Sequence, residues 1–246
     1  MNTEHRGILY GLVLGDGHIS IRQRLGKDKH GTPKYEYTNC ELVFAHSPKQ
    51  KEYIEHKREL LVSVLGGAHP KISTVKSKLS NGKTYPGLRL AKSDTYFRQM
   101  HRVIYPTGKK VFSDTVLDYL TAHSLALWYM DDGSMRCNRN RHGAISSCFA
   151  DLTTHCSEEE AVRIVRWLGE KWGIDAKVRP DAPRGVFNIG FNTRGCHQLA
   201  DVIWPYIIPS MQYKFQYLED FEARTSARDP TEPKKRFDLF NWREGL

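Results

Sequence analysis

The sequence lacks the features that mark membrane, secreted and zinc-finger proteins. No apolar run approaches the ~18–20 residues of a membrane span, and the N-terminal stretch MNTEHRGILYG has the pattern of neither a signal peptide nor a transit peptide. The five cysteines never form a C-x-x-C pair, and their spacing from one another and from His142 matches no standard zinc finger. An odd number of scattered cysteines is typical of reduced thiols. We therefore expect the protein in an intracellular, reducing compartment, either a prokaryotic cytoplasm or an organelle such as a mitochondrion or chloroplast.

Acidic residues are also few relative to basic ones. The chain contains 28 Asp and Glu residues and 37 Lys and Arg residues, so its net charge is +9. Aromatic residues make up 11% of the chain. Such a surplus favours a polyanionic partner, most often nucleic acid, over the alternative of a merely basic soluble enzyme. With 246 residues, of which 39% are hydrophobic, the chain is long and apolar enough to fold around a core. It can form one domain, or two of about 120 residues each.

Two apolar segments end in the same way, with aspartate followed by glycine. The first is GILYGLVLGDG at residues 7–17, and the second is VLDYLTAHSLALWYMDDG at residues 116–133. A helix that is apolar on all sides must be buried, and glycine commonly follows a helix C-terminus. Capping alone explains the carboxylates poorly, because Asp is disfavoured at the negative end of a helix dipole. The pattern therefore favours a metal site at the helix ends.

The order Tyr129-Met130-Asp131-Asp132 also occurs in the metal-binding turn of reverse transcriptases. In a polymerase, that turn should lie between two short strands and act with a further carboxylate in a much larger protein. Here the four residues follow a long apolar segment, and a similar Asp-Gly end stands at residue 16. The sequence therefore disfavours the polymerase interpretation.

The same order of elements follows each Asp-Gly end. Two strand-like stretches come first, then an amphipathic helix that begins after a serine, two further strands and a closing helix. The closing helices lead into VIYP (103–106) and VIWP (202–205). This pattern predicts a duplicated αββαββα unit in a mixed α/β (α+β) fold. We expect a first repeat at 1–115, a second at 116–222 and a basic C-terminal tail at 223–246.

The two helix ends, LYGLVLGDG and LALWYMDDG, resemble the LAGLIDADG motif of homing endonucleases. The matching residues are Leu9, Gly11, Leu12, Asp16 and Gly17 in the first copy and Leu125, Ala126, Asp132 and Gly133 in the second. Two copies in one chain are similar to the single-chain, intron-encoded meganucleases, and the resemblance extends over roughly residues 6–222. It implies two pseudo-symmetric repeats, with the motif helices packed at the centre and saddle-shaped β-sheets facing DNA.

The spacing of small residues supports close packing of the two motif helices. Gly7, Gly11 and Gly15 recur every four residues, which lets another helix approach closely. Ala122 and Ala126 are the residues that we expect to face them.

If the motif helices pack side by side, Asp16 and Asp132 emerge together. Two neighbouring carboxylates repel each other unless a cation lies between them, and hard oxygen ligands select Mg²⁺. The resemblance implies that both acids are catalytic and hold metal, and that the carbonyls of Gly15 and Asp131 are further ligands. It also implies two or three divalent ions shared between Asp16 and Asp132.

The resemblance further implies one basic residue in each repeat near the cleaved phosphate. By position these are Lys110, with Lys109 as an alternative, and Lys214. Such a lysine can neutralise charge that develops during cleavage. The alternative is a solvated lysine that binds any phosphate.

Polar and basic residues line the strands that are expected to contact DNA. Arginine reads guanine and asparagine reads adenine when a β-ribbon enters the major groove. The candidates for DNA binding are Arg22, Arg24, Lys76, Lys78, Arg136, Asn138, Arg139, Arg141, Lys177 and Arg179.

These features predict a monomeric, site-specific endonuclease that makes a staggered break in double-stranded DNA with Mg²⁺. The main alternative is an intron maturase of the same fold, which binds intron RNA without cleavage. A catalytically silent DNA-binding module is less favoured, because both acids are present. An intein is disfavoured as well, since the chain neither starts with Cys or Ser nor ends in His-Asn.

Overall fold

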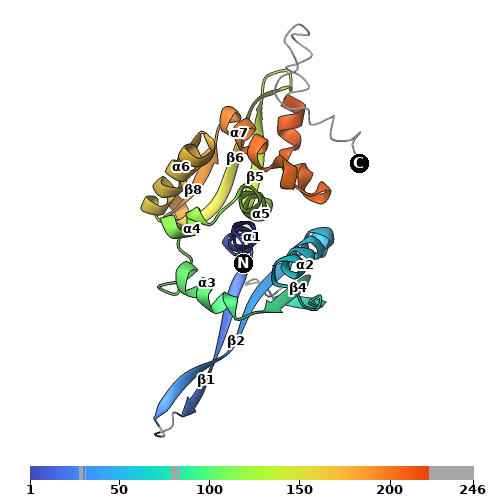
Figure 1. The fold of residues 1–246 in the computed structure, drawn as a ribbon. Helices are drawn as coiled ribbons and strands as arrows, with labels where there is room; N and C mark the ends of the chain where they lie inside the picture. Colours follow the sequence, from blue (N-terminus) through green and yellow to red (C-terminus); the bar gives the residue numbers. More distant parts are fainter. Residues whose placement is uncertain (28–29, 31, 79–81, 83, 222–246) are drawn as a thin grey trace. The chain divides into compact units, whose positions relative to one another are not determined.

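The computed structural model describes residues 1–27, 30, 32–78, 82 and 84–221 (Figure 1). The chain forms two compact units, Met1–Asp131 and Asp132 onward, and each is described by itself. The predicted tail at 223–246 lies outside the described residues. The repeat boundary near residue 115 stays a prediction; the compact units divide further along the chain, between Asp131 and Asp132 at the end of the second motif helix.

The first unit contains a four-stranded antiparallel sheet in the order β1-β2-β4-β3. Its elements are α1 (Thr3–Leu14), β1 (His18–Lys27), β2 (Pro33–His46), α2 (Lys51–Leu65), β3 (Ile72–Lys78), β4 (Thr84–Ser93), α3 (Tyr96–Ile104), α4 (Asp114–Asp118) and most of α5 (Ala122–Asp132). The β1–β2 hairpin, blue in Figure 1, extends well beyond the helices of this unit.

The second unit repeats the arrangement, with sheet order β5-β6-β8-β7. After the end of α5 come β5 (Gly133–Arg139), β6 (Ile145–Cys156), α6 (Glu158–Trp172), β7 (Ala176–Asp181), β8 (Val186–Phe191), α7 (Thr193–Ile203) and the 3₁₀ segment η4 (Pro209–Phe215). Two αββαββα repeats with matching strand orders confirm the predicted fold class.

Helix α1 is buried along most of its length, as its composition predicts. The side chain of Asn2 caps its start by accepting the His5 N–H at 2.7 Å. Every residue from Gly7 to Leu14 is buried. A helix without a polar face is stable in a soluble unit only when other elements surround it.

Helices α1 and α5 approach closely at two glycines. A Cβ atom at Gly11 would lie 2.6 Å from the Ser124 carbonyl oxygen, and one at Gly7 would lie 2.8 Å from Ser124 Oγ. The close approach agrees with the glycine spacing. The expected partners were wrong, because Ser124 rather than Ala122 or Ala126 supplies the nearest atoms to both glycines.

The remaining general features agree with the composition. All five cysteines lie among the described residues and are free, and burial raises the pKa of Cys196 to about 12. No helix in the described part of the chain is long and apolar enough to cross a membrane.

Candidate metal site and nucleic-acid interface

Asp16 lies just beyond the C-terminus of α1, where the helix dipole favours cations. Its side chain is 41% exposed. The ammonium of Lys110 donates to the last helix carbonyls, at 3.0 Å to Leu14 and 2.9 Å to Gly15. The adjacent Lys109 is exposed. Of the two lysines considered, Lys110 is therefore the one that reaches the helix end.

The second unit places a lysine at the corresponding position. Lys214, in η4, donates from Nζ to the Gly133 carbonyl at 2.7 Å. Gly133 directly follows Asp132, the last residue of α5. In each unit the predicted lysine therefore lies at the Asp-Gly end of that unit's motif. The sharing of metal ions between Asp16 and Asp132 stays a prediction.

Asp131 is buried in the first unit as half of an ion pair. Its Oδ1 accepts from Lys57 Nζ at 2.6 Å, and both side chains are 0% exposed. Its Oδ2 accepts the backbone N–H of Asp16 at 2.9 Å. A Cβ atom at Gly15 would lie only 2.1 Å from this oxygen, so glycine is required there. Both oxygens of Asp131 are thus engaged by donors from α2 and from the end of α1.

The Lys57 ammonium has a second partner in His46. The distance from Nζ to His46 Nε2 is 3.0 Å, and the rings of Phe44 and Tyr53 lie 4.8 and 4.4 Å from Nζ. An ammonium only donates, so Nε2 accepts and the ring proton is on Nδ1. Burial, reinforced by the Lys57 charge, lowers the pKa of His46 to about 4, so the ring is neutral near pH 7. Its Nδ1 donates to Gln50 Oε1 at 3.3 Å and lies 3.8 Å from Asp16 Oδ2.

Sequence reasoning missed both Lys57 and His46. Neither belongs to a motif, and Lys57 pairs with a residue 74 positions away. The available signal was a lysine on the apolar face of α2, among the buried residues Tyr53, Ile54 and Leu61.

In the second unit, two predicted DNA-binding arginines meet on one acidic residue. Arg136 Nε lies 3.5 Å from Asp151 Oδ2, and Arg179 forms an ion pair with the same oxygen. Arg136 is on β5 and Arg179 is on β7, at opposite edges of the sheet. Gly190 on β8 lies between, and a Cβ there would be in ordinary van der Waals contact, 3.6 Å from Asp151 and 3.7 Å from Arg179.

The other predicted DNA-binding residues fall into two groups. Asn138, Arg139, Arg141 and Lys177 are exposed, and Arg139 donates to the Gly143 carbonyl at 2.8 Å in the β5–β6 turn. In the first unit Lys76 is exposed on β3. The backbones of Arg22 and Arg24 lie in β1 and that of Lys78 in β3, but their side chains are outside the described part of the structure.

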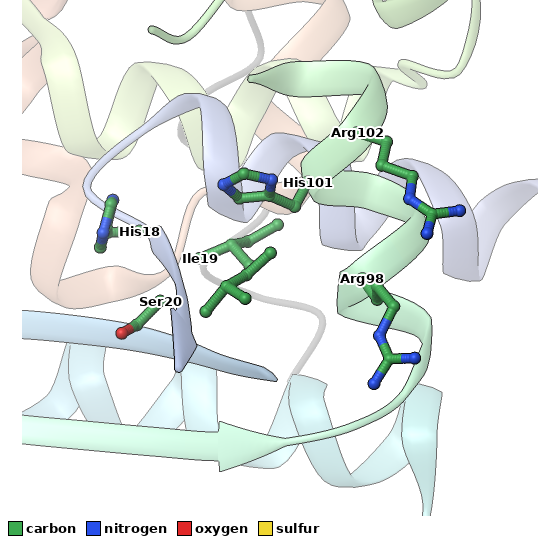
Figure 2. Close-up of a pocket in the computed structure, with 7 residues that line it drawn as sticks. His18, Ile19, Ser20, Arg98, His101 and Arg102 are labelled. Carbon is green, nitrogen blue, oxygen red and sulfur yellow. The ribbon is translucent and has the colours of Figure 1, made fainter. Parts of the chain in front are cut away.

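A basic pocket of about 380 Å³ lies between the start of β1 and α3. Figure 2 shows that its labelled lining residues are His18, Ile19 and Ser20 from the strand and Arg98, His101 and Arg102 from the helix. Burial lowers the pKa of His101, and the neighbouring His18 lowers it further. Two arginines without an acidic residue in this lining suit an anion such as a phosphate group.

The model of the LAGLIDADG DNA endonuclease family matches residues 6–199. The chain belongs to this family. The match covers both Asp-Gly helix ends and both sheets, so the likeness recognised at two short motifs extends through the two units.

The curated relatives of this LAGLIDADG protein include RecA proteins and cytochrome b mRNA maturases. Protein RecA of Mycobacterium shimoidei is 28% identical over 235 residues, which is 93% of this chain and 50% of that protein. Cytochrome b mRNA maturase bI2 of Debaryomyces hansenii is 25% identical over 216 residues, which is 87% of this chain and 74% of that protein. The chain therefore spans about half the length of the RecA relatives that it matches.

Solved structures share the fold. The homing endonuclease I-WcaI bound to its DNA recognition sequence has a TM-score of 0.66 at 24% identity, with 87% of this chain and 86% of that chain covered. I-SmaMI, bound to an uncleaved DNA target in the presence of calcium ions, has a TM-score of 0.56 at 12% identity, with 94% of each chain covered. At these identities, the likeness shows the fold alone.

Three residues near the end of α1 have side chains that can bind a metal, but only one of these side chains is accessible. Ligand atoms of Asp16, His46 and Asp131 lie within 4.8 Å of one another, so the group could hold a metal. However, Lys57 lies within hydrogen-bonding distance of His46 and Asp131. The accessible carboxylate of this group is that of Asp16. One carboxylate with helix-end carbonyls and water is a ligand set that suits Mg²⁺, which keeps several waters.

Proposed function

We propose that this LAGLIDADG protein is a site-specific homing endonuclease. It makes a staggered double-strand break in a long DNA target by Mg²⁺-dependent hydrolysis of phosphodiester bonds. The observation that carries the proposal is the paired arrangement at the motif ends: Asp16 with Lys110 in one unit, and Asp132 with Lys214 in the other. Each unit thus has one acid and one ammonium, which is what cleavage of one strand requires.

The chemistry divides between the acids and the lysines. Bound Mg²⁺ supplies polarisation of the phosphate and a lowered pKa for an attacking water. Asp16 and Asp132 hold the two or three ions, with the carbonyls of Gly15 and Asp131 as further ligands. The ammoniums of Lys110 and Lys214 stabilise negative charge as it develops on the phosphate oxygens.

DNA recognition relies on the basic residues of the two sheets. Arg136 and Arg179 share Asp151 as an acceptor, so both guanidinium groups are held in place before DNA arrives. Binding should weaken with salt, with a slope of about −0.9 per phosphate neutralised. Because one chain carries both repeats, a monomer in an intracellular compartment suffices to engage both halves of an asymmetric target.

The test is cleavage of a defined plasmid. The plasmid carries the DNA that flanks this coding sequence, joined as it would be without the intervening element. We expect a staggered cut with Mg²⁺, and its loss in the Asp16→Asn and Asp132→Asn variants. If one variant leaves a nick in a single strand, the two acids serve different strands. Undiminished double-strand cutting by both variants would overturn the assignment of the acids.

A second candidate function is maturation of an intron RNA. The similarity to the cytochrome b mRNA maturases named bI2 favours it. Tight binding of the surrounding intron RNA, with no cutting of the plasmid, would favour the maturase over the nuclease. Binding together with cutting would indicate that one chain performs both functions.

A further inference from the structure

The buried pair of Lys57 and Asp131 is not explained by stability alone. Both side chains are 0% exposed, so both charges have lost their hydration. Replacing such a pair by apolar residues of similar volume is often neutral or stabilising. A charged pair in this position therefore needs another reason.

The second unit contains the apolar alternative. Helices α2 and α6 are followed by Gly66 and Gly173, and the residues nine positions earlier are Lys57 and Ile164. Both are buried, as are their neighbours at the matching positions, Ile54 and Leu61 in α2 and Ala161 and Leu168 in α6. An isoleucine therefore suffices for packing in this kind of helix, and the lysine serves the residue that it contacts.

That residue is Asp131, and Asp131 contacts the main chain of Asp16. Lys57 binds Oδ1 at 2.6 Å, which fixes the carboxylate so that Oδ2 accepts the Asp16 N–H at 2.9 Å. Lys57 also donates to His46 Nε2, and the ring's Nδ1 proton is directed to Gln50 Oε1 at 3.3 Å rather than to Asp16. The backbone of Asp16 is thus held by the Lys57 ammonium through a single intermediate residue, Asp131.

We propose that Lys57 is a positioning residue for Asp16. Acting through Asp131, it fixes the main chain of Asp16 and thereby the position of the Asp16 carboxylate at the end of α1. It also keeps the Asp131 carboxylate and the His46 ring from acting as metal ligands, because its ammonium occupies the space between them. The catalytic consequence rests on the proposed endonuclease function, whereas the structural consequence does not.

The first measurement needs no activity. Amide hydrogen exchange at Asp16 is compared in the wild type, in Lys57→Met and in the control Leu61→Ala, which creates a cavity on the same face of α2. We expect exchange at Asp16 to accelerate about tenfold or more in Lys57→Met relative to the control, after correction for global stability. Equal exchange in the two variants would overturn the proposal.

Because Lys57→Met removes the Lys57 charge from a buried carboxylate and could unfold the protein, a second variant is needed. The double variant Lys57→Ile with Asp131→Ala removes both charges and gives α2 the residue type that α6 has. It should fold, and it should still show faster exchange at Asp16 than Leu61→Ala does. Normal protection of the Asp16 amide in this folded double variant would also overturn the proposal.

The second measurement follows each DNA strand separately in the plasmid cleavage assay. A misplaced Asp16 should slow the cutting of one strand by about 10- to 100-fold relative to the other, since an error of about 1 Å in position costs roughly that much. The KM for DNA should stay unchanged. Leu61→Ala, which only lowers the folded fraction, should slow both strands equally.

The outcomes separate the two proposals. If the wild type does not cut, the endonuclease proposal fails, and exchange at Asp16 still decides the role of Lys57. If the wild type cuts and Lys57→Met slows both strands equally, the positioning role fails while the endonuclease proposal stands.

Discussion

Helices α2 and α6 occupy equivalent places in two units of the same topology, yet they bury different residues. The helix of the first unit buries Lys57, and that of the second buries Ile164. The helix ends differ as well: α1 leads through Gly15 to Asp16, whereas α5 ends in Asp131 and Asp132. The duplicated scaffold thus accepts either an apolar residue or an ion pair at this point. The ion pair is present where an additional carboxylate must be accommodated.

The largest expected effect comes from breaking the ion pair on one side. Lys57→Met removes the ammonium that pairs with the buried Asp131 and should lower the free energy of unfolding by about 3–5 kcal/mol. The equivalent change in the second unit, Ile164→Met, preserves an apolar contact and should cost less than about 1.5 kcal/mol. Urea unfolding of both variants measures the difference. Similar losses would show that the first unit does not depend on this charge.

The next comparison concerns glycines. A Cβ at Gly11 would lie 2.6 Å from the Ser124 carbonyl oxygen, so Gly11→Ala should destabilise the first unit by about 1–3 kcal/mol. At Gly190 the nearest atoms lie 3.6 Å or further, so Gly190→Ala should stabilise the second unit by about 0.5 kcal/mol through the unfolded chain. Thermal unfolding distinguishes the two. A tolerated alanine at Gly11 would contradict the close approach of α1 and α5.

Acid should affect the first unit more than the second. Burial lowers the pKa of His46 and of His56, each to about 4, and both residues lie in the first unit. In the unfolded chain these histidines are protonated near pH 6.5, whereas in the folded unit they are protonated only near pH 4. The free energy of unfolding therefore decreases as the pH falls from about 6.5 toward 4. Between pH 7 and pH 6 the loss should be about 0.7 kcal/mol per histidine. Hydrogen exchange measured on peptides from each unit tests this, and His56→Gln should reduce the loss.

The smallest expected effect is at the sheet surfaces. In Asp151→Asn the two arginines lose their shared anion, so non-specific DNA binding should strengthen while the preference for the target falls, by about 1 kcal/mol or less. In the first unit Glu41 lies 3.7 Å from Arg89, and Glu41→Gln is the matched change. Fluorescence anisotropy at two salt concentrations measures both. If Asp151→Asn leaves the preference for the target over non-specific DNA unchanged, the two arginines recognise the target without being held by Asp151.

The sequence alone predicts the repeated order of helices and strands, because burial follows helical and strand periodicity in each segment. The four-residue glycine spacing likewise predicts a close approach for α1. It does not predict that Ser124 is the partner, because the rotation of α5 about its axis depends on packing along its whole length. Nor does it predict the contact between Lys57 and Asp131, since a single lysine on an apolar helix face has no local pattern and its partner is 74 positions away.

The ion pair has a consequence for the exchange of halves between related chains. By the predicted repeat boundary, Asp131 falls in the second repeat and its counterion Lys57 in the first. A chimera that joins this first repeat to a second repeat without a carboxylate at this point would carry an orphaned ammonium in its core. The reverse chimera would bury the Asp131 carboxylate without the Lys57 charge. We therefore expect chimeras between relatives to fold only when the two halves match at these two positions.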